Sequence, residues 1–288
     1  MTAALKRWQF WRAKRPEQQL GLFVSANAAW ACKATAEHDV RFYSHQGDWS
    51  ALFSELATNY GAATLQLVLA AGRYQVLTVD RPNVPEDEMQ QALLWSVKDM
   101  VQTPVTDIHL DYFEFPSASA SKIQVVITDR RELSKMALAA QAQGLEIVGI
   151  SIEELMPANL FEADNQARLV VSHVPGEDVF LTVVKNRELW MFRRVRGFSA
   201  LDSYTEDDLR GRIADSLSLE LQRSMDFFES QMRQAPVNSI ELLCSGERQL
   251  LGKLVSANFN QPVNLVEAAD ICAKFAELGC LELSREEA

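Results

Sequence analysis

The sequence lacks a long apolar segment. Its apolar runs all fall well short of the roughly 20 residues that a membrane-spanning helix needs. The first residues are too charged and too aromatic for a secretory signal, which requires an apolar core and a small-residue cleavage site. We therefore expect a cytoplasmic protein without a membrane span of its own.

Metal and redox motifs are also missing. The chain has only four cysteines and four histidines in 288 residues, and the histidines are scattered. Cys272 and Cys280 are neighbours, but their spacing fits neither a zinc knuckle nor a redox CxxC pair. We expect reduced thiols in the core, no metal site and no catalytic residue.

The chain also has no excess of positive charge, since it has 28 basic and 39 acidic residues. The net charge of −11 argues against nucleic-acid binding. Only the segment Met1–Arg15 opposes this trend, because it has five basic residues, no acidic one, and the aromatic residues Trp8, Phe10 and Trp11. Two interpretations stay open: a short peripheral anchor on an anionic membrane, or a terminus whose tryptophans pack on the body or on a partner.

The rest of the chain contains the same predicted order of strands and helices twice. Each copy has three strands, a helix and a buried strand, and the length suffices for two medium cores. The first copy is expected at Leu20–Ala26, Ala29–Ala34, Asp39–Tyr43, Trp49–Asn59 and Leu65–Ala70. The second is expected at Arg168–His173, Val179–Lys185, Glu188–Arg196, Thr205–Arg233 and Ile240–Cys244. The polar break Asp164–Gln166 then separates a first domain, 17–163, from a second, 164–288, after the N-terminal segment 1–16.

An α+β subdomain at about 77–150 interrupts the first copy. Pro85 and the acidic residues after it favour the start of a helix, and Thr103–Pro104 ends it. A buried stripe along this helix is formed by Met89, Leu93 and Val97. The elements expected next are the strands Ile108–Phe115 and Ile123–Thr128, the helix Glu132–Gln143 and the strand Glu146–Ile150. A last helix, Ile152–Phe161, has Glu153 and Glu154 at its N-terminus.

The subdomain resembles that of the PilM family of actin-like pilus-assembly proteins. In that family a helix ends in a proline-containing turn and leads into a strand of the type hydrophobic-x-Leu-Asp-aromatic. The matching residues are Leu93–Asp99, then Pro104, then His109–Phe113. The resemblance implies an α/β actin-like ATPase fold, with two ribonuclease-H-like domains around a cleft and the α+β subdomain inserted in the first.

The family's nucleotide site is poorly matched. Its first phosphate hairpin, aspartate-apolar-Gly-Ser-Ser, falls on Phe23–Asn27, so a phenylalanine replaces the metal-binding aspartate. Its second falls on Ser172–Val174 or His173–Pro175, without a carboxylate in either register. A glycine pair matches Ser245–Gly246. We expect no ATP hydrolysis and no resident cofactor, with any residual ATP contact at Ser25, Asn27 and Gly246.

The resemblance also implies partners. Such a protein lies under the inner membrane, captures the N-terminal cytoplasmic tail of a bitopic PilN-like protein, and relays the state of the pilus motor ATPase. The tail would lie extended in a groove between the first domain's sheet and the insertion. The residues expected to contact it are Trp95, Met100, Val101 and Val105, although the helical stripe leaves Trp95 and Met100 open to a core role. Two alternatives remain: a working ATPase or sugar-kinase relative, and a GspL-like cytoplasmic domain of a type II secretion system.

Overall fold

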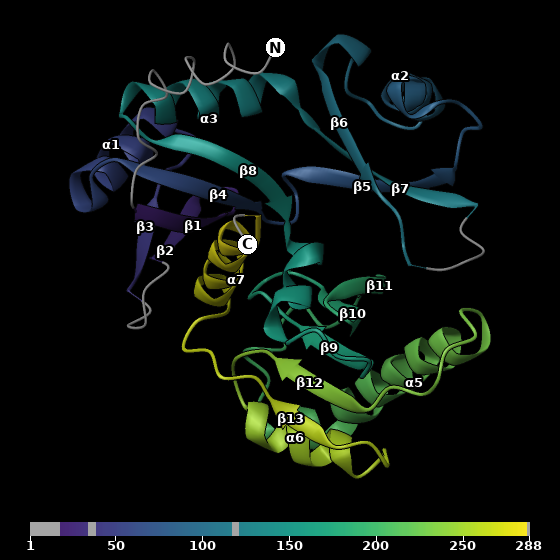
Figure 1. The fold of residues 1–288 in the computed structure, drawn as a ribbon. Helices are drawn as coiled ribbons and strands as arrows, with labels where there is room; N and C mark the ends of the chain where they lie inside the picture. Colours follow the sequence, from purple (N-terminus) through teal and green to yellow (C-terminus); the bar gives the residue numbers. More distant parts are fainter. Residues whose placement is uncertain (1–17, 34–38, 117–120, 287–288) are drawn as a thin grey trace, which may run out of the picture.

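The computed structural model describes residues 18–33, 39–116 and 121–286. The segment Met1–Arg15 lies outside them, so both interpretations of that segment remain predictions. The described residues form two five-stranded sheets and one three-stranded sheet. Figure 1 shows the first five-stranded sheet and the three-stranded sheet in the upper half of the molecule, with the second five-stranded sheet below them.

Domain I is built on a mixed sheet in the order β3-β2-β1-β4-β8. Its strands are β1 (Gln18–Val24), β2 (Ala28–Lys33), β3 (Val40–Ser44), β4 (Ala63–Leu69) and β8 (Glu146–Ile152). The first three are antiparallel, and β4 and β8 run parallel to β1. Helix α1 (Trp49–Tyr60) starts at Asp48, whose side chain accepts from the Ala51 amide, and buries an apolar face on this sheet.

Domain II repeats this connectivity in the order β11-β10-β9-β12-β13. Its strands are β9 (Arg168–Ser172), β10 (Val179–Lys185), β11 (Glu188–Val195), β12 (Ser239–Leu243) and β13 (Val263–Leu265). The long helix expected before β12 is present as α4 (Glu206–Asp208), the π turn η5 (Leu209–Ile213) and α5 (Ala214–Ser230). Helix α6 (Arg248–Ser256) follows β12, and its buried face joins the same core as α5.

The insert has its own sheet in the order β5-β7-β6, with β5 (Tyr74–Asp80), β6 (Ile108–Phe113) and β7 (Lys122–Asp129). Helix α2 (Glu86–Val97) covers one face, and the predicted stripe Met89, Leu93 and Val97 is fully buried there. After α2, the short 3-10 turn η3 (Val105–Asp107) leads into β6.

The expected insert bounds of about 77–150 were too long. Strand β8 pairs with β4 in the first sheet, and helix α3 (Arg130–Ala142) packs beside α1 in the core of domain I. The separate sheet therefore runs from Tyr74 to Asp129. The error arose because periodicity shows that a helix has an apolar face but does not show which core that face joins.

The segment expected as a helix at Ile152–Phe161 is the 3-10 segment η4 (Glu153–Leu160). Pro157 lies inside it and has no amide proton to continue an α-helical ladder. Most of its side chains are buried, because the segment passes between the two domains.

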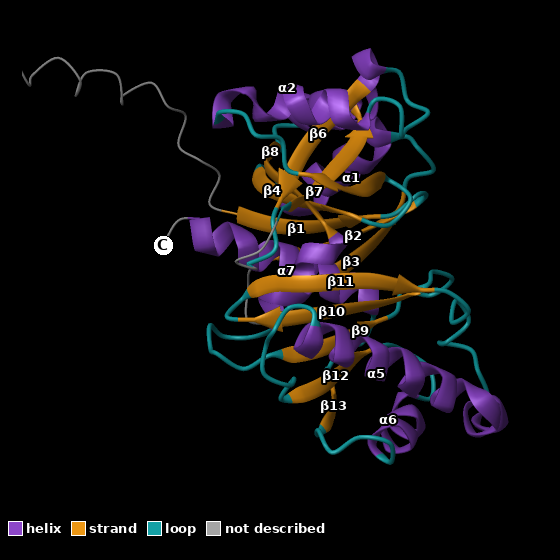
Figure 2. Cartoon of the chain, turned by 90° about the vertical axis from the view of Figure 1, so that its right-hand side faces the viewer, coloured by secondary structure: helices purple, strands orange, loops and turns teal. Residues whose placement is uncertain are grey.

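Helix α7 (Ile271–Glu286) returns from domain II and lies between the two domains, as Figures 1 and 2 show. Sequence order had placed it in the second domain, but it packs on the face of the first sheet. A Cβ on Gly21 of β1 would lie 2.6 Å from the Cys280 amide nitrogen and closer still to the Ala276 carbonyl. The core shared by the domains includes Phe23, Val68, Val184, Leu243 and Phe275.

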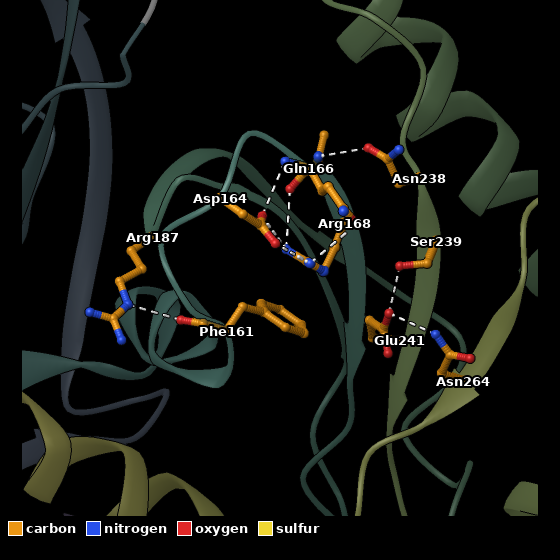
Figure 3. A network of polar contacts seen from close by, with 10 residues as sticks. Phe161, Asp164, Gln166, Arg168, Arg187, Asn238, Ser239, Glu241 and Asn264 are labelled. Carbon is orange, nitrogen blue, oxygen red and sulfur yellow. Dashed lines mark hydrogen bonds and ion pairs between the residues drawn. The ribbon is translucent and has the colours of Figure 1, made fainter.

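Polar contacts, which Figure 3 shows, fix the segment at the boundary between the domains, 164–168. Arg168 donates to both carboxylate oxygens of Asp164 at 2.8 and 2.6 Å, and this pairing lowers the pKa of Asp164 to about 2. The Ala167 amide donates to the Asn238 side chain at 3.1 Å.

Among the described helices, none is long and apolar enough to cross a membrane.

Candidate functional site

The structure brings the predicted phosphate hairpins together around one cleft of about 400 Å³. Ser25 and Asn27 reach it from the β1–β2 turn, Val174 and Pro175 from the β9–β10 turn, and Ser245 from the end of β12. Gly246 is beside Ser245 but packs the other way, since a Cβ there would lie 2.5 Å from the Asp202 carbonyl oxygen. Of the three expected nucleotide contacts, two therefore line the cleft and Gly246 does not.

The backbone groups of the first hairpin, at the β1–β2 turn, are hydrogen-bonded within the protein. The Ser25 amide donates to the Ala28 carbonyl at 2.9 Å, and the Ala28 amide donates to Ser25 Oγ at 3.2 Å. The Arg73 guanidinium donates to the carbonyls of Ser25 and Ala26 at 2.9 and 2.8 Å. A phosphate-binding turn needs backbone amides that are free to point at the ligand, and in this turn the amides of Ser25 and Ala28 already donate to protein acceptors.

Phe23 occupies the position of the expected metal-binding aspartate. It is completely buried and stacks on Phe275 of α7, with ring centroids 5.2 Å apart. The side chain that would hold Mg²⁺ in a working site is thus part of the apolar core between the domains. A carboxylate could not be restored here without being buried against α7, at a cost of several kcal/mol.

The second hairpin is closed in a similar way. His173 is fully buried, and burial lowers its pKa, which disfavours the cation that would bind a phosphate. Its Nε2 lies 3.2 Å from the Ser199 carbonyl, which also accepts from the Gly176 amide at 3.2 Å. The Glu177 amide donates to the Val174 carbonyl at 3.0 Å.

The charge of the cleft opposes a nucleotide. Three carboxylates line it, from Glu153, Glu177 and Asp270, and the part of the chain that the structure describes adds no lysine or arginine to the lining. Burial, followed by repulsion from Glu153, raises the pKa of Glu177. The described residues contain no cluster of three or more side chains suited to a metal ion. The residues present therefore do not fit Mg-ATP, because the phosphates would meet carboxylates without a cation, and the carboxylates are not gathered into a metal site among the described residues.

Glu153 and Glu154 were expected to place negative charge at a helix N-terminus. Instead, both are buried and belong to a network of charged side chains. Arg194 of β11 contacts Glu153 at 2.5 Å and Glu154 at 2.9 Å. Tyr74 of β5 donates its hydroxyl to Glu154, and the Ala71 amide donates to Glu153 at 2.9 Å. Burial and the neighbouring Glu153 raise the pKa of Glu154. This network joins the insert, the η4 segment and domain II.

Sequence reasoning missed this network because its members are far apart along the chain. Tyr74 and Glu154 are separated by 80 positions, and Glu154 and Arg194 by 40. The only local signal was a pair of adjacent glutamates before an apolar segment with an internal proline. That pattern does not distinguish an exposed helix start from a buried ion pair.

The four residues expected to bind a partner tail lie at the end of α2 and in the turn after it. Trp95, Met100 and Val105 are 60%, 54% and 43% exposed, so the core role left open for Trp95 and Met100 does not hold. Val101 is half-buried against the insert's own core. That core contains insert residues only, so these side chains belong to the outer surface of the insert, and none of them lines the cleft.

Two sheets of identical connectivity around a cleft, with a subdomain inserted in the first, define the actin-like ATPase fold. A chain of a PilM–PilN type IV pilus biogenesis complex matches 95% of this chain and 99% of its own length, at 17% identity and a TM-score of 0.62. The cytoplasmic domain of EpsL from the Vibrio cholerae type II secretion system matches 92% and 95%, at 13% identity and a TM-score of 0.52.

A Bacteroides thetaiotaomicron protein of unknown function with an actin-like ATPase fold matches 92% of this chain and 97% of its own, at 9% identity and a TM-score of 0.52. No protein-family model matches the sequence, and no curated protein matches it either. At such identities the likeness establishes the fold.

Proposed function

We propose that this chain is a non-catalytic scaffold of a type IV pilus assembly machine. The observation that carries the proposal is an actin-like cleft whose hairpins are hydrogen-bonded within the protein and whose lining is acidic. The match to a chain of a PilM–PilN complex over nearly the whole length supports the pilus assignment. We further assign it to the MshI type, of the mannose-sensitive haemagglutinin (MSHA) pilus, to which its sequence is similar.

The partner in this proposal is the N-terminal cytoplasmic tail of a PilN-like bitopic inner-membrane protein. Trp95, Met100 and Val105 expose large apolar side chains near one another in sequence, which suits anchoring contacts. Strand β6 follows the η3 turn that begins at Val105, and it is an edge strand of the insert's sheet. An extended tail could add to this edge through main-chain hydrogen bonds and bury alternate side chains beside Val105.

In the same proposal the protein is cytoplasmic and peripheral to the inner membrane. The basic and aromatic residues of Met1–Arg15 would add a contact with anionic lipid, and the pilus motor ATPase would be a second partner. A role as a GspL-like domain of a type II secretion system is the alternative, since the EpsL cytoplasmic domain also matches. Titration with tail peptides of both systems separates the two, because each scaffold should bind only its own.

We expect no ATP turnover above that of a buffer control. The acidic lining repels the phosphates, and the buried Phe23 stands where the family has the carboxylate that holds Mg²⁺. A steady-state phosphate-release assay measures this directly, and Asn27→Arg, which blocks the cleft, distinguishes the protein's own turnover from a contaminant. Turnover that disappears in Asn27→Arg would contradict the prediction.

Met100→Glu and Val105→Glu should each weaken binding of the PilN-like tail about tenfold, through lost apolar contact, without changing the melting temperature. Val101→Glu should lower both binding and melting temperature, because Val101 is half-buried. Leu138→Glu on α3, which is also exposed, is the matched control. Unchanged affinity in both exposed variants would place the tail elsewhere.

A further inference from the structure

A second hollow, of about 630 Å³, lies between the insert and domain II. We call it the interdomain groove. One wall is the polar face of the insert's sheet, where Thr78 and Gln124 are paired across β5 and β7 and hydrogen-bonded at 2.8 Å. The other wall is formed by β11 and the last turns of α5. Phe115, just beyond β6, closes one side by packing on Phe192 of β11, with ring centroids 5.8 Å apart.

The groove is aromatic and has an unsatisfied hydrogen-bond donor. Trp190, Phe192 and Phe227 line it, and about half of the Phe227 side chain is exposed. The indole N–H of Trp190 is buried and has no acceptor among the described residues. Buried donors of this kind nearly always have a partner, so this wall of the groove retains an unsatisfied polar group.

The groove is basic in an otherwise acidic chain. Lys122, Arg193 and Arg223 line it, and no carboxylate is among its described lining residues. Arg193 and Arg223 share a single acid, Glu220, and Lys122 is 4.0 Å from Asp80, so the positive charge is only partly balanced. In a protein of net charge −11, such a local excess favours an acidic occupant.

Strand β11 also offers backbone groups for pairing. It is the edge strand of the second sheet, and its consecutive residues Trp190 to Arg193 line the groove. One side of an edge strand is unpaired, and an extended segment can add to it by main-chain hydrogen bonds. Its alternate side chains would then face Phe192 and Phe115 on one side and the two arginines beside α5 on the other.

From these features we propose that the interdomain groove binds an extended acidic segment of a partner protein, with alternating apolar and acidic side chains, as an added strand on β11. The lining of the groove includes none of the four residues at and after the end of α2 that are proposed for the tail. The scaffold would therefore hold two partners at once, and this inference does not depend on the identity of the tail.

The test uses the full chain and a fluorescein-labelled synthetic peptide that alternates glutamate with leucine or phenylalanine. Its counterpart has lysine in place of every glutamate. Fluorescence anisotropy should show binding of the acidic peptide and at least tenfold weaker binding of the lysine peptide. Arg223→Glu and Phe227→Ala should each weaken the acidic peptide about tenfold, because both side chains are exposed in the groove.

Matched controls are available on the same helical segment. Arg210→Glu and Leu219→Ala change an exposed arginine and an exposed leucine outside the groove, and both should bind the acidic peptide as the wild type does. Val105→Glu should also leave the affinity for the acidic peptide unchanged, which separates this site from the proposed tail site.

Absence of binding, equal binding of both peptides, or equal loss in the control variants would overturn the proposal. Loss of binding to anionic vesicles in Arg223→Glu, with peptide binding unchanged, would also overturn it, because the surface would then contact lipid.

Discussion

Replacing Arg194 by alanine is expected to lower the free energy of unfolding by about 3–5 kcal/mol. The change leaves Glu153 and Glu154 buried next to each other without the guanidinium that both contact. Because the three residues join η4 to β11, the loss should also loosen domain II against domain I. Urea denaturation at neutral pH measures the change. Arg187→Ala, whose partner Glu162 is exposed, should cost no more than about 1 kcal/mol.

The pH dependence of the same network has a definite sign. Burial raises the pKa of Glu154 above its ordinary value of 4.5, so the folded protein binds this proton more tightly than the unfolded chain. The ionised carboxylate therefore costs stability as the pH rises from 4.5 through the raised pKa. Glu154→Gln removes this cost, so its stability relative to the wild type should increase as the pH rises from about 4.5 through the raised pKa. A relative stability that decreases over this range would contradict the assignment.

Gly21→Ala should destabilise the protein by about 1–3 kcal/mol, and by more if α7 cannot shift. The added Cβ would meet backbone atoms of α7, including the Cys280 amide nitrogen at 2.6 Å, and backbone cannot rotate away as a side chain can. The collision separates the first sheet from the helix that joins the two domains. Thermal and urea unfolding both report the loss.

Gly211 provides the opposite case within the same chain. No atom lies within 4 Å of a Cβ placed there, and the residue is in the η5 helical turn. Gly211→Ala should therefore raise stability by about 0.4–1 kcal/mol, because alanine restricts the unfolded chain. Similar effects of the two substitutions would mean that the close packing of β1 on α7 contributes little to stability.

Sequence patterns predicted the duplicated architecture well. The strands β1, β2 and β4 and their counterparts β9, β10 and β12 lie within two residues of the expected positions. Apart from β2, these strands have apolar runs that are buried on both faces, so the run itself predicts the strand without knowledge of its partner. The degenerate hairpins could also be located, because a missing aspartate and Pro175 are visible in the sequence itself.

Long-range packing could not be predicted in the same way. The placement of α7 against domain I depends on the missing side chain of Gly21, about 250 positions earlier, and no local pattern records that contact. The assignment of β8 and α3 to domain I failed for the same reason. The basic, aromatic interdomain groove combines Thr78, Gln124, β11 and α5, which come together only in the folded chain.

The central claim is that this actin-like protein works as a scaffold without a nucleotide. A calorimetric titration of the full chain with the PilN-like tail peptide, in the presence and absence of Mg-ATP, tests it most directly. The account predicts saturable binding of the peptide with the same affinity under both conditions, and no heat from Mg-ATP alone. Tail binding that requires Mg-ATP, or tight binding of Mg-ATP to the free protein, would contradict it.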